Sequence, residues 1–279
     1  MISGTTRLIA HLGYPTEGFR APLIYNPWFE QAGIDAAVVP MGVLPGDYAT
    51  TLAALAKMTN FHGALVTMPH KVTTVALLDE CSEAVRIAGA CNAILRRPDG
   101  TLMGDLFDGQ GFTRALERRA FGFAGARCLV AGAGGVGSAI AAALARAGVG
   151  AITLSDPVEG RAERVVDGLR MHYPGVELNA GAADAAGYNL VVNATPLGAR
   201  DSDPLPLGPA NLSPTAFVAD VVLERELTPL LQAAQAAGCA VQTGLDMLFE
   251  QIPLYLEFFG FGTATPEELR AVAREPRGP

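Results

Sequence analysis

The segment CLVAGAGGVGSAIAAALARAG, residues 128–148, constrains the fold of this chain more than any other stretch. A short apolar run leads into glycines spaced as GxGxxG, and small residues with helical spacing follow. Gly132 permits a tight turn, Gly134 leaves room beside the backbone, and Gly137 lets a helix pack on the strand. The segment therefore predicts the strand, turn and helix that open a dinucleotide-binding domain. The turn residues expected to line the nucleotide are Gly132, Ala133, Gly134, Gly135, Val136 and Gly137.

The residue that ends the next strand-like run, AITLSD, bears on which nucleotide is bound. Asp156 stands near the separation of about 20 residues at which a carboxylate accepts hydrogen bonds from the adenosine ribose. The same carboxylate repels a 2′-phosphate, so we expect NAD rather than NADP, although Arg161 follows in the next helix. An N-cap role for Asp156 is compatible with this assignment. The alternative for the whole motif is a glycine-rich turn that binds no ligand.

Short β-branched runs alternate with helical patterns in the first third of the chain, which predicts a parallel sheet. The expected strands are 7–13, 36–43 and 63–69, and the expected helices are 21–33, 46–58 and 71–81. Residues 91–105 then form two strand-like runs joined at Pro98-Asp99-Gly100. This pattern is typical of a β-hairpin, which we expect at the edge of the sheet.

A second series of strands and helices begins at the glycine motif. Its expected strands are 128–132, 151–156, 176–181, 189–195, 216–222 and 239–244, in an order that fits a doubly wound sheet. Two helices follow, 245–260 and 265–275, and the first is too apolar for a surface position. We therefore predict an α/β protein of two domains. A substrate domain with a mostly parallel sheet covers 1–106 and is completed by 246–279, a Rossmann-type domain covers 107–245, and the ligand cleft lies between them.

Composition narrows the class of function. The sequence is 50% hydrophobic and 17% charged with a net charge of −8, and it contains no basic run suited to nucleic acid. No stretch approaches the ~18 apolar residues of a membrane span, and no signal-peptide layout is present, so we expect a cytoplasmic protein. Neither the four cysteines nor the four histidines have the spacing of a metal site. We expect a small-molecule substrate and a monomer or homodimer.

Six ordered motifs resemble those of the shikimate dehydrogenase family, which includes the quinate/shikimate dehydrogenases. They are LVTMPHK, AGACNAIL, GDLFDG, GAGGVG, NATPLG and TGLDMLFEQ, and the resemblance runs from about Leu8 to Phe259. It implies a substrate domain, an NAD(P)-binding domain and a C-terminal helix that returns to the first domain. The implied reaction is reversible hydride transfer between a ring hydroxyl carbon and nicotinamide.

The resemblance also assigns roles to individual residues. The family's catalytic lysine and aspartate fall on Lys71 and Asp108, and oxidation of a secondary alcohol requires such a base. Lys71 is the candidate acid/base and Asp108 orients it, although either group could transfer the proton. The substrate contacts implied are Thr67, Asn92 and Gln251, and Arg20 is placed to clamp a carboxylate. The nicotinamide contacts implied are Asn193, Thr195, Val221, Gly244 and Met247.

Structural roles compete with several of these assignments. Asn92 also suits a backbone-bonding role in the hairpin, and Gln251 an ordinary helix position. Core packing explains Val221 and Met247 at least as well, and Arg20 could be a solvated residue at a helix start.

Polar residues of the family's substrate pocket are apolar here. The departures are Phe19 and Ala21 for two serines that hold the substrate carboxylate, Leu65 and Leu106-Phe107 for amide and hydroxyl groups, and Leu223 for a tyrosine. Each lost partner costs ~1–3 kcal/mol with a polyhydroxylated carboxylate ligand. We therefore predict a dehydrogenase whose substrate is less polar than shikimate or is presented differently. The leading alternative is a true shikimate/quinate dehydrogenase.

Two further hypotheses come from other classes. One is a non-catalytic, NAD-binding regulator that has kept the fold, which the intact Lys71 and Asp108 disfavour. The other is a methylene-tetrahydrofolate dehydrogenase, against which the VTxPxK and GDxxDG motifs argue.

Overall fold

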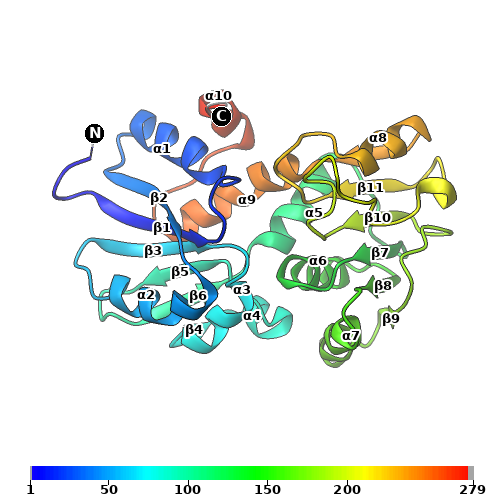
Figure 1. Ribbon diagram of the computed structural model, residues 1–279, viewed down its shortest axis with the longest axis horizontal. Coiled ribbons are helices and arrows are strands. Elements are labelled where there is room, and N and C mark those ends of the chain that lie inside the picture. The colour runs from blue at the N-terminus through cyan, green and yellow to red at the C-terminus, as the bar shows by residue number, and fades with distance from the viewer. Residues whose placement is uncertain (1, 276–279) are drawn as a thin grey trace. The chain divides into compact units, whose positions relative to one another are not determined.

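The structure, a computed structural model, describes residues 2–275 and confirms the α/β class (Figure 1). The chain forms two compact units. The first runs to Phe107 and resumes at Ile252, and the second spans Asp108–Gln251. The predicted boundaries lie at 106/107 and 245/246, so the second differs by several residues. The reason is helix α9, Gly244–Phe258, which contributes residues to both units.

The sheet of the first unit has the strand order β2-β1-β3-β5-β6-β4. Its strands are β1 Arg7–Gly13, β2 Ala36–Gly42, β3 Phe61–Val66, β4 Glu80–Cys81, β5 Ala93–Arg96 and β6 Leu102–Asp105. β1 lies between β2 and β3 and is parallel to both, as expected, and β5 and β6 form the antiparallel hairpin. The ends of β1 and β3 therefore meet at one edge of the sheet.

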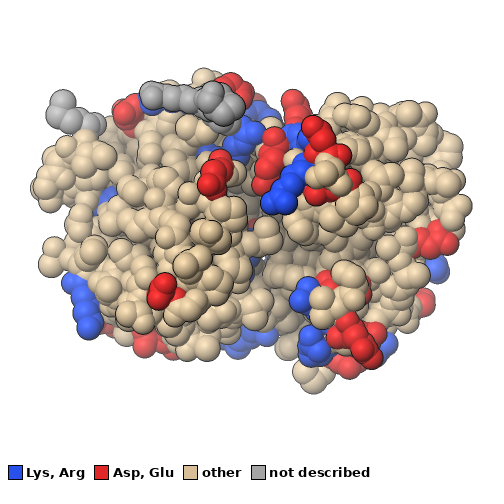
Figure 2. Space-filling model, viewed as in Figure 1, with Lys and Arg blue, Asp and Glu red and all other residues tan. Residues whose placement is uncertain are grey.

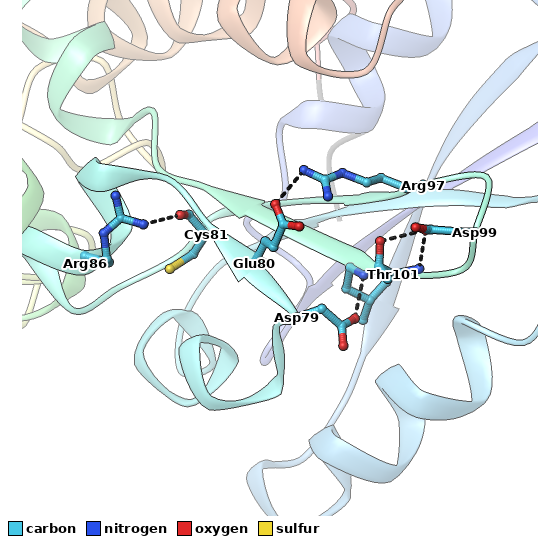
Figure 3. A network of polar contacts seen from close by, with 8 residues as sticks. Asp79, Glu80, Cys81, Arg86, Arg97, Asp99 and Thr101 are labelled. Carbon is cyan, nitrogen blue, oxygen red and sulfur yellow. Dashed lines mark hydrogen bonds and ion pairs between the residues drawn. The ribbon is translucent and has the colours of Figure 1, made fainter.

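The hairpin is not the edge of this sheet. The two-residue strand β4 pairs outside β6, and polar contacts hold the segments around it (Figure 3). Arg97 forms an ion pair with Glu80 at 2.9 Å, and Asp79 accepts a hydrogen bond from the amide of Leu102 at 2.8 Å. The helix predicted over 71–81 is accordingly short, since α3 covers Lys71–Thr74 and a 3-10 turn, η2, covers Val75–Leu77.

Further helical segments belong to the first unit. They are α1 Ala21–Ala32, η1 Pro45–Asp47, α2 Tyr48–Leu55, α4 Glu83–Ala88 and α10 Pro266–Val272. Asn26 of α1 exchanges two hydrogen bonds with the backbone of Val38, which ties the helix to β2. Arg274, just beyond α10, donates its amide to the carbonyl of Leu23, so the C-terminal segment packs on α1.

The second unit has an all-parallel sheet in the order β12-β11-β10-β7-β8-β9. Its strands are β7 Arg127–Ala131, β8 Ala151–Ser155, β9 Glu177–Ala180, β10 Leu190–Asn193, β11 Phe217–Asp220 and β12 Ala240–Gln242. Its other helical segments are α5 Asp108–Arg118, α6 Gly135–Arg146, α7 Arg161–His172, η3 Pro209–Asn211 and α8 Pro229–Ala236. This is the doubly wound order, in which the direction of winding reverses between β7 and β10.

Glycines allow helices of the second unit to approach closely. A β-carbon on Gly109 of α5 would overlap the backbone oxygen of Ala139 in α6. One on Gly111 would lie 2.7 Å from Cβ of Gln251 in α9. Arg119, beyond the end of α5, also pairs with Asp246 of α9 at 2.7 Å. The start of α5 is therefore held against both α6 and α9.

Two surface properties bear on function. Within residues 2–275 no helix combines the length and apolar character needed to cross a membrane. Figure 2 shows acidic and basic side chains interspersed on the visible face.

Gly63 of β3 provides a test of packing in the first sheet. A β-carbon there would overlap the carbonyl oxygen of Ile94 and lie 2.8 Å from the ring of Phe259. We expect Gly63→Ala to lower the free energy of unfolding by about 1–3 kcal/mol, because backbone of the adjacent strand must move. Gly168→Ala in α7, where the added carbon meets no described atom within 4 Å, is the matched control and should raise stability by ~0.5–1 kcal/mol. Urea denaturation measures both, and equal effects would contradict the packing argument.

Candidate active site

In the first unit, the end of β3 positions a buried lysine. The amide of Thr67 donates to the carbonyl of Leu12 at 2.9 Å, which continues the β1–β3 pairing one residue past β3. The chain turns through Met68-Pro69, and Lys71 begins α3 with 8% of its surface exposed. The carbonyl of Lys71 accepts the amide of Cys91 at 2.9 Å, which fixes the backbone beneath the side chain.

Lysine is rare in this chain. The sequence has 20 lysines and arginines together, and only two of them, Lys57 and Lys71, are lysines. Lys57 is exposed. A guanidinium stays protonated at any working pH, whereas an ammonium group can give up its proton. A chain that uses arginine at nearly every cationic position thus has its one buried lysine at the end of a parallel strand.

The turn before Lys71 is braced by residues that the sequence did not single out. His70 is 1% exposed, its Nε2 lies 2.8 Å from the carbonyl oxygen of Val43, and its ring stacks on Tyr48 at 4.0 Å. The Tyr48 hydroxyl in turn lies 2.6 Å from that of Thr74. Burial lowers the pKa of His70, so its ring is neutral and supports α3 without adding charge beside Lys71. The only sequence feature that could have pointed to this bracing is the histidine directly before the lysine.

Asn92 lies directly beside the end of β3. Its carbonyl accepts the amide of Val66 at 2.8 Å, and its side-chain oxygen accepts the amide of Phe107 at 3.0 Å. Its side-chain nitrogen is buried and has no hydrogen-bond partner among the described residues. Asn92 thus performs the structural role considered for it and also retains one donor that a ligand could use.

Among the substrate-pocket positions that are apolar in sequence, Phe19 and Leu223 are partly exposed and the others are buried. Leu65, Leu106 and Phe107 are 4%, 3% and 6% exposed. Phe107 packs edge-on against Tyr255 and Phe258, with ring centroids 5.0 and 5.5 Å away. Arg20, the candidate carboxylate clamp, lies 4.0 Å from the carboxylate of Glu275, which is 97% exposed. The Arg20 side chain itself is 22% exposed, and its role as a carboxylate clamp stays a prediction.

Asp108 and Gln251 meet in the second unit. Gln251 of α9 donates from Nε2 to the carboxylate of Asp108 at 2.8 Å, and these residues are 5% and 3% exposed. Asp108 occupies the first turn of α5, where the helix dipole stabilises a negative charge. The structure therefore brings together two residues that the motifs singled out separately, and Gln251 fixes the orientation of Asp108.

The glycine turn lies at the switch point of the second sheet, between the ends of β7 and β10. Gly132 has a φ of +101°, and a β-carbon there would lie 2.8 Å from the backbone of Ala194. A β-carbon on Gly137 would overlap the Gly132 carbonyl. Gly134, by contrast, faces open space, and Gly134, Gly135 and Val136 are all partly exposed. Helix α6 starts here, so its free amides suit a pyrophosphate, and these residues fit a dinucleotide.

Asp156 is already engaged by the protein. Its carboxylate accepts the amides of Ala133 at 2.8 Å and Val158 at 2.9 Å, and its side chain is 4% exposed. Arg161 lies 3.3 Å from it and is 43% exposed. Because its oxygens hold the glycine turn and its charge faces a guanidinium, Asp156 is a poor partner for ribose hydroxyls. The partly exposed Arg161 is instead a suitable partner for a phosphate.

Asn193 has a structural role behind the expected nicotinamide region. It donates to the carbonyl of Leu197 at 2.9 Å and to Asp220 at 3.0 Å, and it accepts the Thr195 hydroxyl at 2.7 Å. Asp220, which the sequence did not reveal as functional, is fully buried and also accepts the Thr228 hydroxyl at 2.8 Å. Burial raises the pKa of Asp220, and these hydrogen bonds oppose that shift.

The remaining predicted nicotinamide contacts lie near the start of α9. A β-carbon on Gly244 would lie 2.9 Å from the backbone of Val221, so the helix start and the end of β11 require a glycine. Val221 is partly exposed, and Met247 is 7% exposed. Their assignment as nicotinamide contacts stays a prediction. Across residues 2–275 there is no group of histidines, cysteines and acids able to hold a metal ion.

A doubly wound sheet with this glycine turn, in one chain with a second α/β unit that carries a buried lysine, defines a two-unit dinucleotide-dependent dehydrogenase. Comparison with known proteins identifies the family. The family model of the shikimate dehydrogenase substrate binding domain matches residues 12–94, and that of the ThiF family matches residues 122–158. A shikimate dehydrogenase (NADP(+)) from Acidiphilium cryptum is 40% identical over 281 residues, covering 100% of both chains. The chain therefore belongs to the shikimate dehydrogenase family.

Solved structures agree in fold. The shikimate 5-dehydrogenase from Thermus thermophilus in complex with NADP(H) and shikimate is 27% identical, with a TM-score of 0.86 over 96% of this chain and 99% of that one. A ligand-free 5-ketofructose reductase from Gluconobacter sp. strain CHM43 is also 27% identical, with a TM-score of 0.84 over 97% of this chain and 99% of that one.

The prediction of NAD as cofactor is wrong. The Acidiphilium relative and further relatives at 36% and 37% identity are all named for NADP(+). The error came from treating Asp156 as a free carboxylate. In the structure its charge is paired with Arg161 and its oxygens are bonded to backbone amides, so the repulsion expected for a 2′-phosphate is largely removed.

Proposed function

We propose that this protein catalyses reversible hydride transfer between a secondary ring alcohol and NADP, with shikimate as the substrate that its relatives favour. The observation that carries the proposal is the buried Lys71 at the end of β3, adjacent to Thr67 and Asn92. The bound nucleotide would supply the hydride acceptor. The glycine turn, with its open face at Gly134, would hold the pyrophosphate.

In this mechanism the protein's own residues handle the hydroxyl proton. Lys71 accepts it as the alcohol is oxidised and returns it in the reverse direction, a step worth about 10²–10⁴-fold in rate. Asp108, oriented by Gln251, steadies the ammonium form and hydrogen-bonds the reacting hydroxyl. Thr67 and the unpaired amide nitrogen of Asn92 supply contacts that orient the ring. Low exposure around Lys71 keeps water from competing for the proton.

Removal of the Lys71 amine tests the catalytic assignment. We expect Lys71→Ala to lower kcat with shikimate and NADP+ by roughly 10²-fold or more, because the proton then has no acceptor. The dissociation constant for NADPH, measured by fluorescence titration, should stay within about twofold, since Lys71 belongs to the other unit. Lys57→Ala removes the only other lysine and is the matched control. A normal kcat in the Lys71→Ala enzyme would contradict the catalytic role and leave Lys71 with a structural role only.

Arg161 tests the choice of nucleotide. We expect Arg161→Ala to weaken NADP+ binding by roughly tenfold to a hundredfold while leaving NAD+ binding nearly unchanged, because only NADP+ carries the 2′-phosphate. Arg170→Ala, at the far end of α7 and paired with Asp167, is the control. Calorimetric titration with both nucleotides gives the ratio of the NADP+ and NAD+ dissociation constants. Equal losses for NADP+ and NAD+ would show that Arg161 only supports the fold through Asp156.

A second candidate substrate class is favoured by the apolar pocket positions. Phe19 and Ala21 stand where the resemblance places the serines that hold the carboxylate, and Leu65 where it places an asparagine. A substrate without a carboxylate would not need the two serines that Phe19 and Ala21 replace. One of the similar solved structures is named a reductase of 5-ketofructose, which is a compound without a carboxylate.

Direct comparison of substrates separates the two candidates. If the pocket residues set specificity, kcat/KM for NADPH-dependent reduction of 5-ketofructose should exceed that for 3-dehydroshikimate by about tenfold or more, since the latter buries an unpaired carboxylate. Initial rates of NADP+-dependent oxidation should also be measured with quinate and with shikimate. A kcat/KM for 3-dehydroshikimate above that for 5-ketofructose would reject the second candidate and leave the first in place.

A further inference from the structure

His11 lies on the same face of the first sheet as the end of β3 that carries the candidate catalytic residues. In the parallel register of β1 and β3, His11 pairs with Leu65, so the two side chains project to one face. The next position on that face agrees, since a β-carbon on Gly13 would meet the side chain of Thr67 and the ring of Phe19. His11 thus stands one strand away from Leu65, where the resemblance has an asparagine.

The hydrogen bonding of His11 differs from that of the other histidines in the first unit. Nε2 of His62 lies 2.8 Å from the carbonyl oxygen of Phe259, and Nε2 of His70 lies 2.8 Å from that of Val43. His11 is only 9% exposed, yet its Nδ1 is fully buried and has no hydrogen-bond partner within the described residues. Buried polar groups are nearly always bonded, so an exception at this place points to a missing ligand.

A second unpaired group lies on the other side of the same strand. The side-chain nitrogen of Asn92 is buried without a partner in the described chain, and the carbonyl of Asn92 accepts the amide of Val66. β3 therefore has His11 on one side and Asn92 on the other, and its end leads into Thr67 and Lys71. In the antiparallel register Asn92 stands opposite Val66, so its side chain starts from the other face of the sheet. The case for a ligand at His11 therefore rests on the face that it shares with Leu65 and Thr67.

The chemistry of His11 limits what that ligand group can be. Burial, together with the nearby ammonium of Lys71, lowers the pKa of His11 to about 3, so the ring is uncharged at working pH. An uncharged imidazole accepts from a hydroxyl or donates to a carbonyl oxygen, but offers no charge to a carboxylate. Phe19 stacks on the ring at 4.0 Å and covers one of its faces, leaving the ring edge for hydrogen bonding.

Resting on the proposed function, we infer that His11 is a substrate-binding residue whose ring nitrogen hydrogen-bonds a hydroxyl or keto oxygen of the substrate beside Thr67 and Lys71. In this position it supplies, from β1, a polar contact in place of the one absent at Leu65 of β3. It would thereby select substrates by their hydroxyl pattern rather than by their charge.

Substitutions that preserve the ring or the hydrogen bond test this inference. His11→Phe keeps the stacking on Phe19 and removes both nitrogens, while His11→Asn and His11→Gln restore an amide near Nδ1 or Nε2. We expect His11→Phe to raise KM for the better of shikimate and 5-ketofructose by roughly tenfold, with kcat reduced less, because one hydrogen bond is lost. At least one amide variant should recover most of the loss. The NADPH dissociation constant and the shape of the pH profile should not change.

Controls separate this inference from the proposed function. His62→Phe, whose histidine is bonded to Phe259 in the same unit, should leave KM unchanged even if Tm falls. A wild-type protein that transfers hydride and a His11→Phe protein with the same KM would overturn only the inference. A His11→Phe loss that neither amide recovers, with a matching fall in Tm, would overturn it in favour of packing. A wild type that neither converts nor binds either compound, by rates and by thermal shift, would overturn both.

Discussion

The burial of one ammonium group is the constraint on which the first unit depends. Lys71 is 8% exposed, and removing a positive charge from water is costly unless the surroundings accommodate it. The residues nearby are consistent with that requirement. His11 and His70 both have pKa values lowered by burial, so neither adds a second positive charge beside Lys71. Fixed backbone hydrogen bonds from Thr67 and Cys91 hold the turn in place. The neutral rings of His11 and His70 therefore add no charge repulsion to the cost of burying Lys71.

Large-scale features could be predicted because they follow from periodicity and motif spacing. Each predicted strand of both sheets is found, since β-branched runs bounded by turns have few other folded forms. Smaller features could not be predicted. The strand β4 is only Glu80–Cys81 and owes its place to contacts with Arg97 and to pairing with β6, which no local pattern encodes. The predicted boundary at 245/246 lies several residues before Ile252 for a related reason, because a continuous helix gives no sign of where contacts change from one unit to the other.

The candidate site could likewise be predicted only in part, because motifs reveal individual residues but not the partners that the fold brings to them. Motifs identified Lys71, Asp108 and the glycine turn as residues of interest, but their partners come from distant segments. Asp156 is the clearest example. From sequence it predicts NAD, but in the structure its carboxylate is bonded by the amides of Ala133 and Val158 and paired with Arg161. Asp220 went unnoticed because a buried aspartate after an apolar strand has no signature until Asn193 and Thr228 are seen to bond it.

The scarcity of lysine has a practical consequence for observing the protein at work. With Lys57 exposed and Lys71 buried, reductive methylation with ¹³C-formaldehyde introduces labels at only two side-chain positions. Besides the signal of the α-amino group, which reacts as well, the resulting spectrum would contain one signal from solvent-facing Lys57 and one from the neighbourhood of β3. The first acts as an internal reference, and the second reports on protonation and ligand arrival at a single atom without any mutation.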